Sequence, residues 1–344
     1  MTLLRRLGLG ALALAFLHVI LAPVVRITGS GLGCGDHWPK CHGYWFPPFD
    51  RMDLIIEVMH RYIAASLSLT LLALLGFAIA RRRDAGVGGR GGVLRAAALA
   101  VALTVVVSVF GGVTVKLHLP APVTATHLVL AMALLATLVA AVHRAGGLGA
   151  SRVAAGGASG KTHRGAMVAA VLAILAVALG ALTAKIPGAA AACQGFPLCT
   201  GGVLPRFPVQ HVQFTHRMLA FLLLFHMVGL AVVMAKRGDP AAVVRAGRIA
   251  LGAVVTQIVV AAALVLLYLP QQLQWLHSAM ATTVWVTVFA FFALARRGAL
   301  GEPQRVPVPP STDAVLPRAE PAAVATATPH SVAVIVARGA GGDL

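Results

Sequence analysis

The stretch EVMHRYIAAS (residues 57–66) places a carboxylate, an imidazole and a guanidinium inside an apolar run that extends from about residue 54 to residue 80. Ionisable groups are costly in a membrane-spanning helix unless they face the protein interior and have a partner there. The composition requires such a setting, because 59% of the residues are hydrophobic, 11% are charged and the mean hydropathy is +0.87. These values lie outside the range of soluble domains. We therefore predict an all-α polytopic membrane protein in which Glu57, His60 and Arg61 point inward.

Eight apolar segments are long enough to cross a bilayer, which takes roughly 20 residues each. Basic residues cluster at every second connection between them, so the positive-inside bias predicts that both termini are cytoplasmic. The net charge of +18 is explained by these clusters, and we expect no nucleic-acid partner. The predicted spans are residues 7–25, 54–80, 93–115, 122–142, 166–187, 208–235, 247–269 and 273–295.

Residues 298–344 are rich in Ala, Pro and Val and show little amphipathic pattern. We predict a disordered cytoplasmic tail there and assign it no function. The first apolar segment follows Arg5 and Arg6 but is too long for the apolar core of a signal peptide, and it is kept as a helix.

All four cysteines fall on the predicted outer side, in GCGDHWPKCHG (33–43) and ACQGFPLCTGG (192–202). Outside the cytoplasm such thiols tend to be oxidised, and the simplest connectivity is one local disulfide in each loop, Cys34 with Cys41 and Cys193 with Cys199. The bonds could be structural only, or the first pair could have a redox role. A zinc site formed by the first loop's cysteines with His37 and His42 is a third reading, on ligand type alone.

The two loops open an internal repeat. Each ends in an aromatic-Pro-x-Cys sequence, a His-Arg pair follows each loop at similar spacing, and LHLP (117–120) and LYLP (267–270) each place a proline seven residues before a histidine. Four matches in the same order predict a parallel duplication. We expect two pseudo-symmetric four-helix bundles, an N-terminal half at 1–145 and a C-terminal half at 166–297, joined by a cytoplasmic linker at 146–165.

The repeat groups four histidines at similar depth near the outer ends of four helices. Each half thus offers two inward imidazoles from facing helices, an arrangement by which helical bundles hold a haem iron. His18 and His226 have no counterpart in the repeat and are ranked below the four. The predicted haem ligands are His60 and His127 in the first half and His216 and His277 in the second.

The halves differ at one position next to these ligands. Glu57 stands three residues before His60, whereas Gln213 stands three residues before His216. A carboxylate near a metal centre can exchange protons and stabilise a developing cation, which an amide cannot do as a base. Glu57 could also serve as an ion-pair partner of Arg61, four residues on. Arg61 and Arg217 could each pair with a haem propionate or extend to lipid headgroups.

These motifs resemble those of the heme A synthase family over nearly all of residues 1–297, in the bacterial form with a cysteine pair in the first and third outer loops. The resemblance rests on TGSGLGCGDHWPKCHG (28–43), EVMHRYIAAS (57–66), FGGVTV (110–115), QFTHRMLAF (213–221) and LPQQLQWLHSAMA (269–281). It implies oxidation of the C8 methyl of haem O to a formyl group in two successive steps. It further implies Glu57 as a catalytic residue, His60 and His127 at the substrate haem, His216 and His277 at a bound haem b, and a link between Cys34, Cys41 and activity.

The resemblance also implies partners. These are a haem O synthase that delivers the substrate, a haem-copper terminal oxidase that receives haem A, an electron acceptor and the lipid of a bacterial cell membrane. Whether one or both imidazoles hold the substrate haem stays open. Two rival functions are a two-haem membrane cytochrome b that only carries electrons, and a transporter built on a paired repeat.

Overall fold

The computed structural model describes residues 1–48, 50–150, 158–199 and 204–299, and eight long helices occur in these ranges. All eight are long and apolar enough to cross a membrane, which confirms the predicted all-helical class and number of spans. The predicted tail lies outside the described residues from residue 300 on. The helices are α1 (Thr2–Ile27), α2 (Met52–Ala80), α3 (Val93–Lys116), α4 (Ala121–Arg144), α5 (Gly160–Lys185), α6 (Pro208–Lys236), α7 (Ala241–Leu266) and α8 (Gln271–Ala299).

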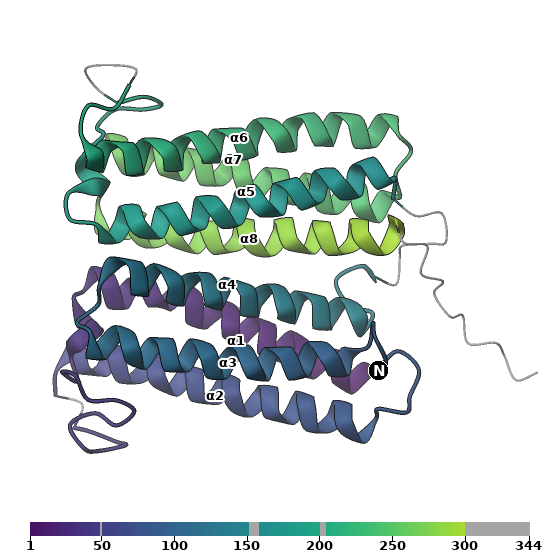
Figure 1. Ribbon diagram of the computed structural model, residues 1–344, viewed down its shortest axis with the longest axis horizontal. Coiled ribbons are helices and arrows are strands. Elements are labelled where there is room, and N and C mark those ends of the chain that lie inside the picture. Colours follow the sequence, from purple (N-terminus) through teal and green to yellow (C-terminus); the bar gives the residue numbers. More distant parts are fainter. Residues whose placement is uncertain (49, 151–157, 200–203, 300–344) are drawn as a thin grey trace, which may run out of the picture. The chain divides into compact units, whose positions relative to one another are not determined.

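The helices pack in two groups of four (Figure 1). In the first group α1 contacts α2 and α4, and α3 contacts α2 and α4; in the second, α5 contacts α6 and α8, and α7 contacts α6 and α8. Contacts of α4 with α5 and α8, and of α1 with α8, join the groups. The pseudo-symmetry of the two bundles and the limits of the two halves at residues 1–145 and 166–297 stay predictions.

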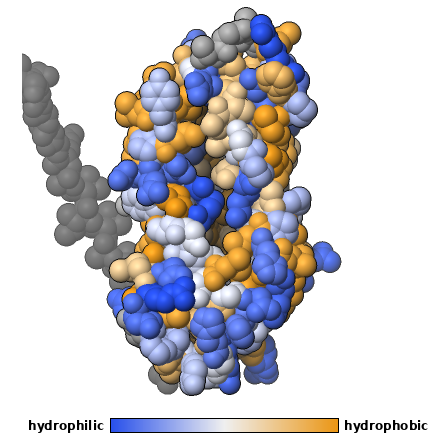
Figure 2. Space-filling model, turned by 90° about the vertical axis from the view of Figure 1, so that its left-hand side faces the viewer, coloured by the Kyte–Doolittle hydropathy of each residue, from blue (hydrophilic) through white to orange (hydrophobic). Residues whose placement is uncertain are grey.

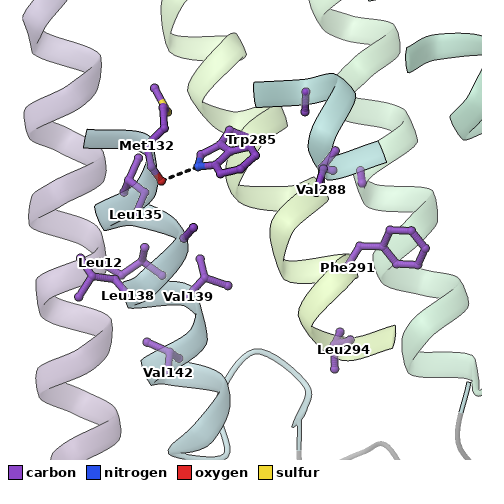
Figure 3. Packing of buried hydrophobic residues seen from close by; sticks show 14 of the residues in the cluster. Leu12, Met132, Leu135, Leu138, Val139, Val142, Trp285, Val288, Phe291 and Leu294 are labelled. Carbon is purple, nitrogen blue, oxygen red and sulfur yellow. Dashed lines mark hydrogen bonds between the residues drawn. The ribbon is translucent and has the colours of Figure 1, made fainter. Parts of the chain in front are cut away.

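The joint between the two groups is an apolar layer formed mainly by α4 and α8 (Figure 3). Leu135 and Leu138 of α4 and Val288 of α8 are fully buried in one continuous cluster, whereas the ring of Phe291 points away from α4 toward the other side of α8. The indole Nε1 of Trp285 donates a hydrogen bond of 2.8 Å to the carbonyl oxygen of Met132, so the one polar atom of this side chain has a partner. Since lipid is as apolar as these residues, close van der Waals packing and this hydrogen bond stabilise the contact between the halves.

The connections α3–α4 and α7–α8 have the same backbone conformation. Each contains two consecutive non-glycine residues in the left-handed region, His118 and Leu119 at φ of 59° and 61°, and Tyr268 and Leu269 at 60° and 62°. Such residues are uncommon outside glycine and persist where the surrounding structure holds them. Both connections lie at the end of the molecule that carries the two disulfide loops, the end seen in Figure 2, where hydrophilic side chains are prominent.

Helix α5 begins earlier than the sequence indicates. The apolar pattern predicts a span from residue 166, but the helix starts at Gly160 and takes in four polar residues from what was assigned to the linker. Ser159 caps it, because its hydroxyl oxygen accepts the backbone N–H of Thr162 at 3.2 Å. Asp239 adds two more bonds, accepting the N–H of Ser159 at 2.7 Å and the hydroxyl of Thr162. Capping therefore carries the helix beyond its apolar part.

Candidate functional site

One cavity of about 940 Å³ is lined by residues of both halves. Its lining combines apolar and small side chains, among them Ala64, Ala65 and Ala281, with a few polar groups. A large apolar cavity with convergent polar groups is the usual form of a cofactor or substrate site. Every histidine, carboxylate and arginine that the sequence predicts for the haem sites lines it, namely Glu57, His60, Arg61, His127, His216, Arg217 and His277.

The helices bring the four histidines to matching depths. His60 and His216 are each the ninth residue of their helix, and His127 and His277 are each the seventh. At 3.6 residues per turn, all four lie about two turns from the outer ends of their helices. The matched depth predicted from the repeat is confirmed, whereas the ligand roles are not tested by the fold.

In the second half the geometry fits a metal held between two imidazoles. The ring centres of His216 and His277 are 6.4 Å apart. An imidazole nitrogen lies about 2 Å from a bound transition metal, so two rings on opposite sides of one metal have centres about 6 Å apart. His216 Nδ1 donates to the carbonyl oxygen of Ala176 at 2.9 Å, which leaves Nε2 with a free lone pair. These residues therefore fit a haem iron.

Gln257 holds the second ring of this pair. Its amide nitrogen lies 3.2 Å from Nδ1 of His277, while its Oε1 is buried with no hydrogen-bond partner among the described residues. The same amide nitrogen lies 3.4 Å from Nε2, so Gln257 faces both ring nitrogens of His277. Turning the amide by 180° places the oxygen at the ring, where it can accept a ring proton and leave the other nitrogen free for a metal. Both imidazoles of the second half therefore have a hydrogen-bonding neighbour that orients the ring, as metal-binding histidines usually do.

Two glycines allow the neighbouring helices to approach these rings. A Cβ added at Gly180 of α5 would lie 2.9 Å from Cε1 of His216, and one added at Gly111 of α3 would lie 3.3 Å from Cε1 of His127. Any side chain at Gly180 would displace the His216 ring.

The first half contains a third imidazole. The ring of His18 lies 4.0 Å from that of His60, centre to centre, and both line the cavity together with His127. Nδ1 of His127 and Nε2 of His18 are buried without a hydrogen-bond partner among the described residues. The histidine rings of this half therefore have fewer hydrogen bonds that orient them than those of the second half, and these two nitrogens are available to a ligand.

Glu57 is held in the first half by two groups. The carboxylate is 5% exposed; its Oε2 accepts the backbone N–H of Cys34 at 2.9 Å, and its Oε1 accepts from Arg61. The ion pair suggested by the four-residue spacing is thus present. Gln213 is equally buried in the second half, where its Oε1 accepts the N–H of Cys193 at 2.7 Å and its Nε2 donates to the carbonyl of Ala190 at 3.0 Å. Both side chains accept a loop N–H, but Glu57 also forms an ion pair with Arg61, whereas Gln213 donates to a loop carbonyl.

Both outer loops are closed by the predicted disulfides, Cys34 with Cys41 and Cys193 with Cys199. The zinc reading of the first loop is wrong, because both sulfur atoms are joined to each other and are no longer thiolate ligands. Arg61 donates to the carbonyl oxygens of His37, Pro39 and Lys40, and Arg217 donates to those of Cys193, Gly195, Pro197 and Leu198. The repeated arginine therefore fixes each disulfide loop over the cavity.

Sequence reasoning missed two residues of this site. His18 was set aside because it has no counterpart in the repeat: sixteen residues before the first cysteine of the second loop stands Val177. Gln257 carries no motif of its own. A signal for both is the placement of a polar side chain in the interior of an apolar span.

The architecture and the cavity define a class, a multi-pass helical membrane protein with paired, half-buried histidines that line a cavity beneath disulfide-closed loops. A family model described as cytochrome oxidase assembly protein, COX15-CtaA, matches residues 5–289. The chain belongs to this family.

Two relatives that are similar over two thirds or more of the chain are heme A synthases. The heme A synthase of Symbiobacterium thermophilum is 30% identical over 298 residues, which cover 83% of this chain and 93% of that protein. That of Bacillus licheniformis is 26% identical over 234 residues, or 67% and 76% of the two chains. A shorter match, 39% identical over 70 residues, covers 20% of this chain and 12% of the protoheme IX farnesyltransferase of Thermus thermophilus. The match to the heme A synthase of Geobacillus kaustophilus, 42% over 65 residues, covers only 20% of that protein.

Proposed function

We propose that this protein acts in haem A biosynthesis as a heme A synthase, oxidising the C8 methyl of haem O to a formyl group in two successive two-electron steps. Written with water as the oxygen source, the conversion adds one oxygen atom and releases four electrons and four protons. The observation that carries the proposal is a single cavity that combines four histidines at matched depth with one buried carboxylate, present in one half only. Membership of the family supports it.

In this proposal His216 and His277 hold a haem b as a permanent redox cofactor. A bis-histidyl haem iron supplies one-electron transfer, with a potential set by its ligands and surroundings. Ala176 and Gln257 fix the orientation of the two rings, and Gly180 leaves room for the first of them. The 6.4 Å separation of the ring centres supports this assignment.

His60 and His127 bind the substrate haem, and Glu57 acts on it. The looser arrangement of the first half suits a ring that must enter and leave. Glu57 is fixed by Cys34 N–H and Arg61 and lines the cavity, so its charge would stabilise a developing cation at a methyl carbon bound beside it. A fixed reacting edge also favours the correct methyl group over others on the ring periphery.

We place the protein in the bacterial cell membrane with both termini cytoplasmic, because the connections α2–α3, α4–α5 and α6–α7 carry the basic clusters. Haem O would come from a farnesyltransferase, an activity for which one relative with a short matching stretch is named. Haem A would pass to a haem-copper terminal oxidase, in line with the family description.

The test is the pigment content of the purified protein. The chain is produced with a haem O synthase, and its haems are extracted and separated by chromatography. The proposal predicts haem b together with haem O and haem A. Haem b alone, with both sites filled, would favour the cytochrome b reading, and absence of any haem would favour a transporter.

A further inference from the structure

Two basic residues outside the repeated sequence motifs line the outer part of the cavity. Arg26 lies in the last turn of α1 and Lys185 in the last turn of α5. Each stands eight residues before the first cysteine of its loop, so the two occupy corresponding positions in the repeat. Both side chains are half-buried. Each half thus has a positive charge, Arg26 or Lys185, at the same position of the repeat, and both charges lie at the rim of a largely apolar cavity.

The other charged groups of the lining are already paired. Arg61 and Arg217 are engaged by loop carbonyls, and Glu57, the one carboxylate among the lining residues, accepts from Arg61 and from Cys34. No ion pair joins Arg26 or Lys185 to a carboxylate within the described part of the chain. Half-buried cations of this kind are stabilised by an anion.

The two cations lie beside helices that carry or support the second histidine pair. Nη2 of Arg26 donates to Oε1 of Gln274 at 3.3 Å, and Gln274 is one turn before His277 on α8. Lys185 is five residues beyond Gly180, which touches the ring of His216, so it lies about 7.5 Å further along α5 toward the outer end. Trp275 Nε1 donates to the carbonyl of Ile20 at 2.8 Å and fixes α1 against α8 at this level.

We infer that Arg26 and Lys185 form a carboxylate-binding site for the two propionates of the tetrapyrrole held by His216 and His277. The inference rests on the proposed function and replaces Arg61 and Arg217 in the propionate role. A guanidinium and an ammonium at the cavity rim give charge-assisted hydrogen bonds to carboxylates, and they orient the ring with its acidic edge outward. The orientation follows from the placement of both cations at the outer end.

The experiment compares binding of haem b and of its dimethyl ester, which lacks both negative charges. Full-length protein is stripped of haem in detergent and titrated with each ligand, and the Soret band reports binding. Variants are Arg26→Gln, Lys185→Gln and the double variant. Lys116→Gln is the matched control, because Lys116 lies at the same end, contacts Asp36 at 3.4 Å and does not line the cavity.

Each single substitution should weaken haem b binding about tenfold, the usual size of a hydrogen bond to a charged group, and leave ester binding unchanged. The double variant should no longer distinguish the two ligands, and the control should behave as wild type. Equal weakening of haem and ester would show a structural role, and equal affinity of the wild type for both would overturn the inference. If the wild type binds neither ligand while folded, the proposed haem function itself fails.

Discussion

The two halves of this protein fix their outer loops in the same way but with different charge next to the cavity. In the first half the backbone N–H of Cys34 donates to the carboxylate of Glu57, and in the second half the N–H of Cys193 donates to the amide oxygen of Gln213. An amide can satisfy a loop N–H and a loop carbonyl at once, as Gln213 does with Cys193 and Ala190. Glu57 is bonded to its loop and ion-paired with Arg61 as well, and we propose that its charge also serves chemistry.

The histidine pairs of the two halves also differ, in the hydrogen bonds that orient their rings. Both rings of the second pair are oriented by a hydrogen-bonding neighbour, whereas His127 has a buried nitrogen without a partner in the described structure and His60 lies against a third imidazole, His18. A prearranged pair suits a permanent cofactor, since less ordering is needed on binding. We therefore expect the first half to hold the ligand that is exchanged.

The largest expected effect separates the two histidine pairs. His216→Ala should reduce retained haem b by at least about a hundredfold, since it removes one of the two imidazoles proposed to hold the iron, a loss of several kcal/mol. His60→Ala should leave retained haem b unchanged. Haem content per protein, measured by pyridine haemochrome spectra, checks both, and loss of haem b in both variants would contradict a division of labour between the halves.

The disulfide loops provide the next comparison. The double substitution Cys34→Ser and Cys41→Ser should lower the turnover of haem O about tenfold. Without the disulfide the loop is looser, and the backbone N–H of Cys34 no longer fixes Glu57. Ser at both Cys193 and Cys199 should leave turnover per bound haem b nearly unchanged and lower the melting temperature instead. Activity assays combined with thermal unfolding distinguish them, and equal loss of turnover in both variants would remove the special role of the first loop.

A smaller effect is expected at His18. His18→Val introduces the residue found at the corresponding position of the second half, Val177. The His60 ring loses its neighbour, and we expect a several-fold change in substrate-haem affinity with haem b spectra unchanged. Val177→Ala, on the other side of the repeat, is the control. A wild-type affinity for haem O in His18→Val would show that the third imidazole only fills space.

The smallest effects on haem binding and turnover are expected at the ends opposite the loops, where substitutions should change stability instead. Asp239→Ala leaves the buried N–H of Ser159 and hydroxyl of Thr162 without their acceptor, which should cost about 1–3 kcal/mol of unfolding free energy. Asp84→Ala removes only an exposed ion pair with Arg81 and should cost less than about 1 kcal/mol. Thermal unfolding in detergent measures both, and equal destabilisation would contradict the assigned capping of α5.

Much of this structure could be predicted from sequence because the chain repeats itself. Eight apolar segments give the helices, and the spacing of prolines and histidines gives the matched depth of His60, His127, His216 and His277, since helical rise converts spacing into distance. The disulfides follow from local cysteine pairs, since ring closure over a few residues leaves few alternatives.

The repeat also explains what sequence reasoning could not find. It directs attention to shared residues, so His18, present in one half only, was discounted although it lies against His60. The arginine after each ligand was assigned to propionates or lipid, whereas its bonds to loop carbonyls depend on how the loop folds back. The early start of α5 depends on Asp239, 77 residues from Thr162, to which it is bonded.

The central claim is that the charge of Glu57 performs the chemistry that Gln213 cannot. Glu57→Gln tests it most directly, because glutamine keeps the shape and the acceptor for Cys34 N–H while removing the charge. The protein is produced with a supply of haem O, and its haems are extracted and separated. We expect an unchanged haem b content, retained haem O and no haem A. Haem A at the wild-type level would contradict the account.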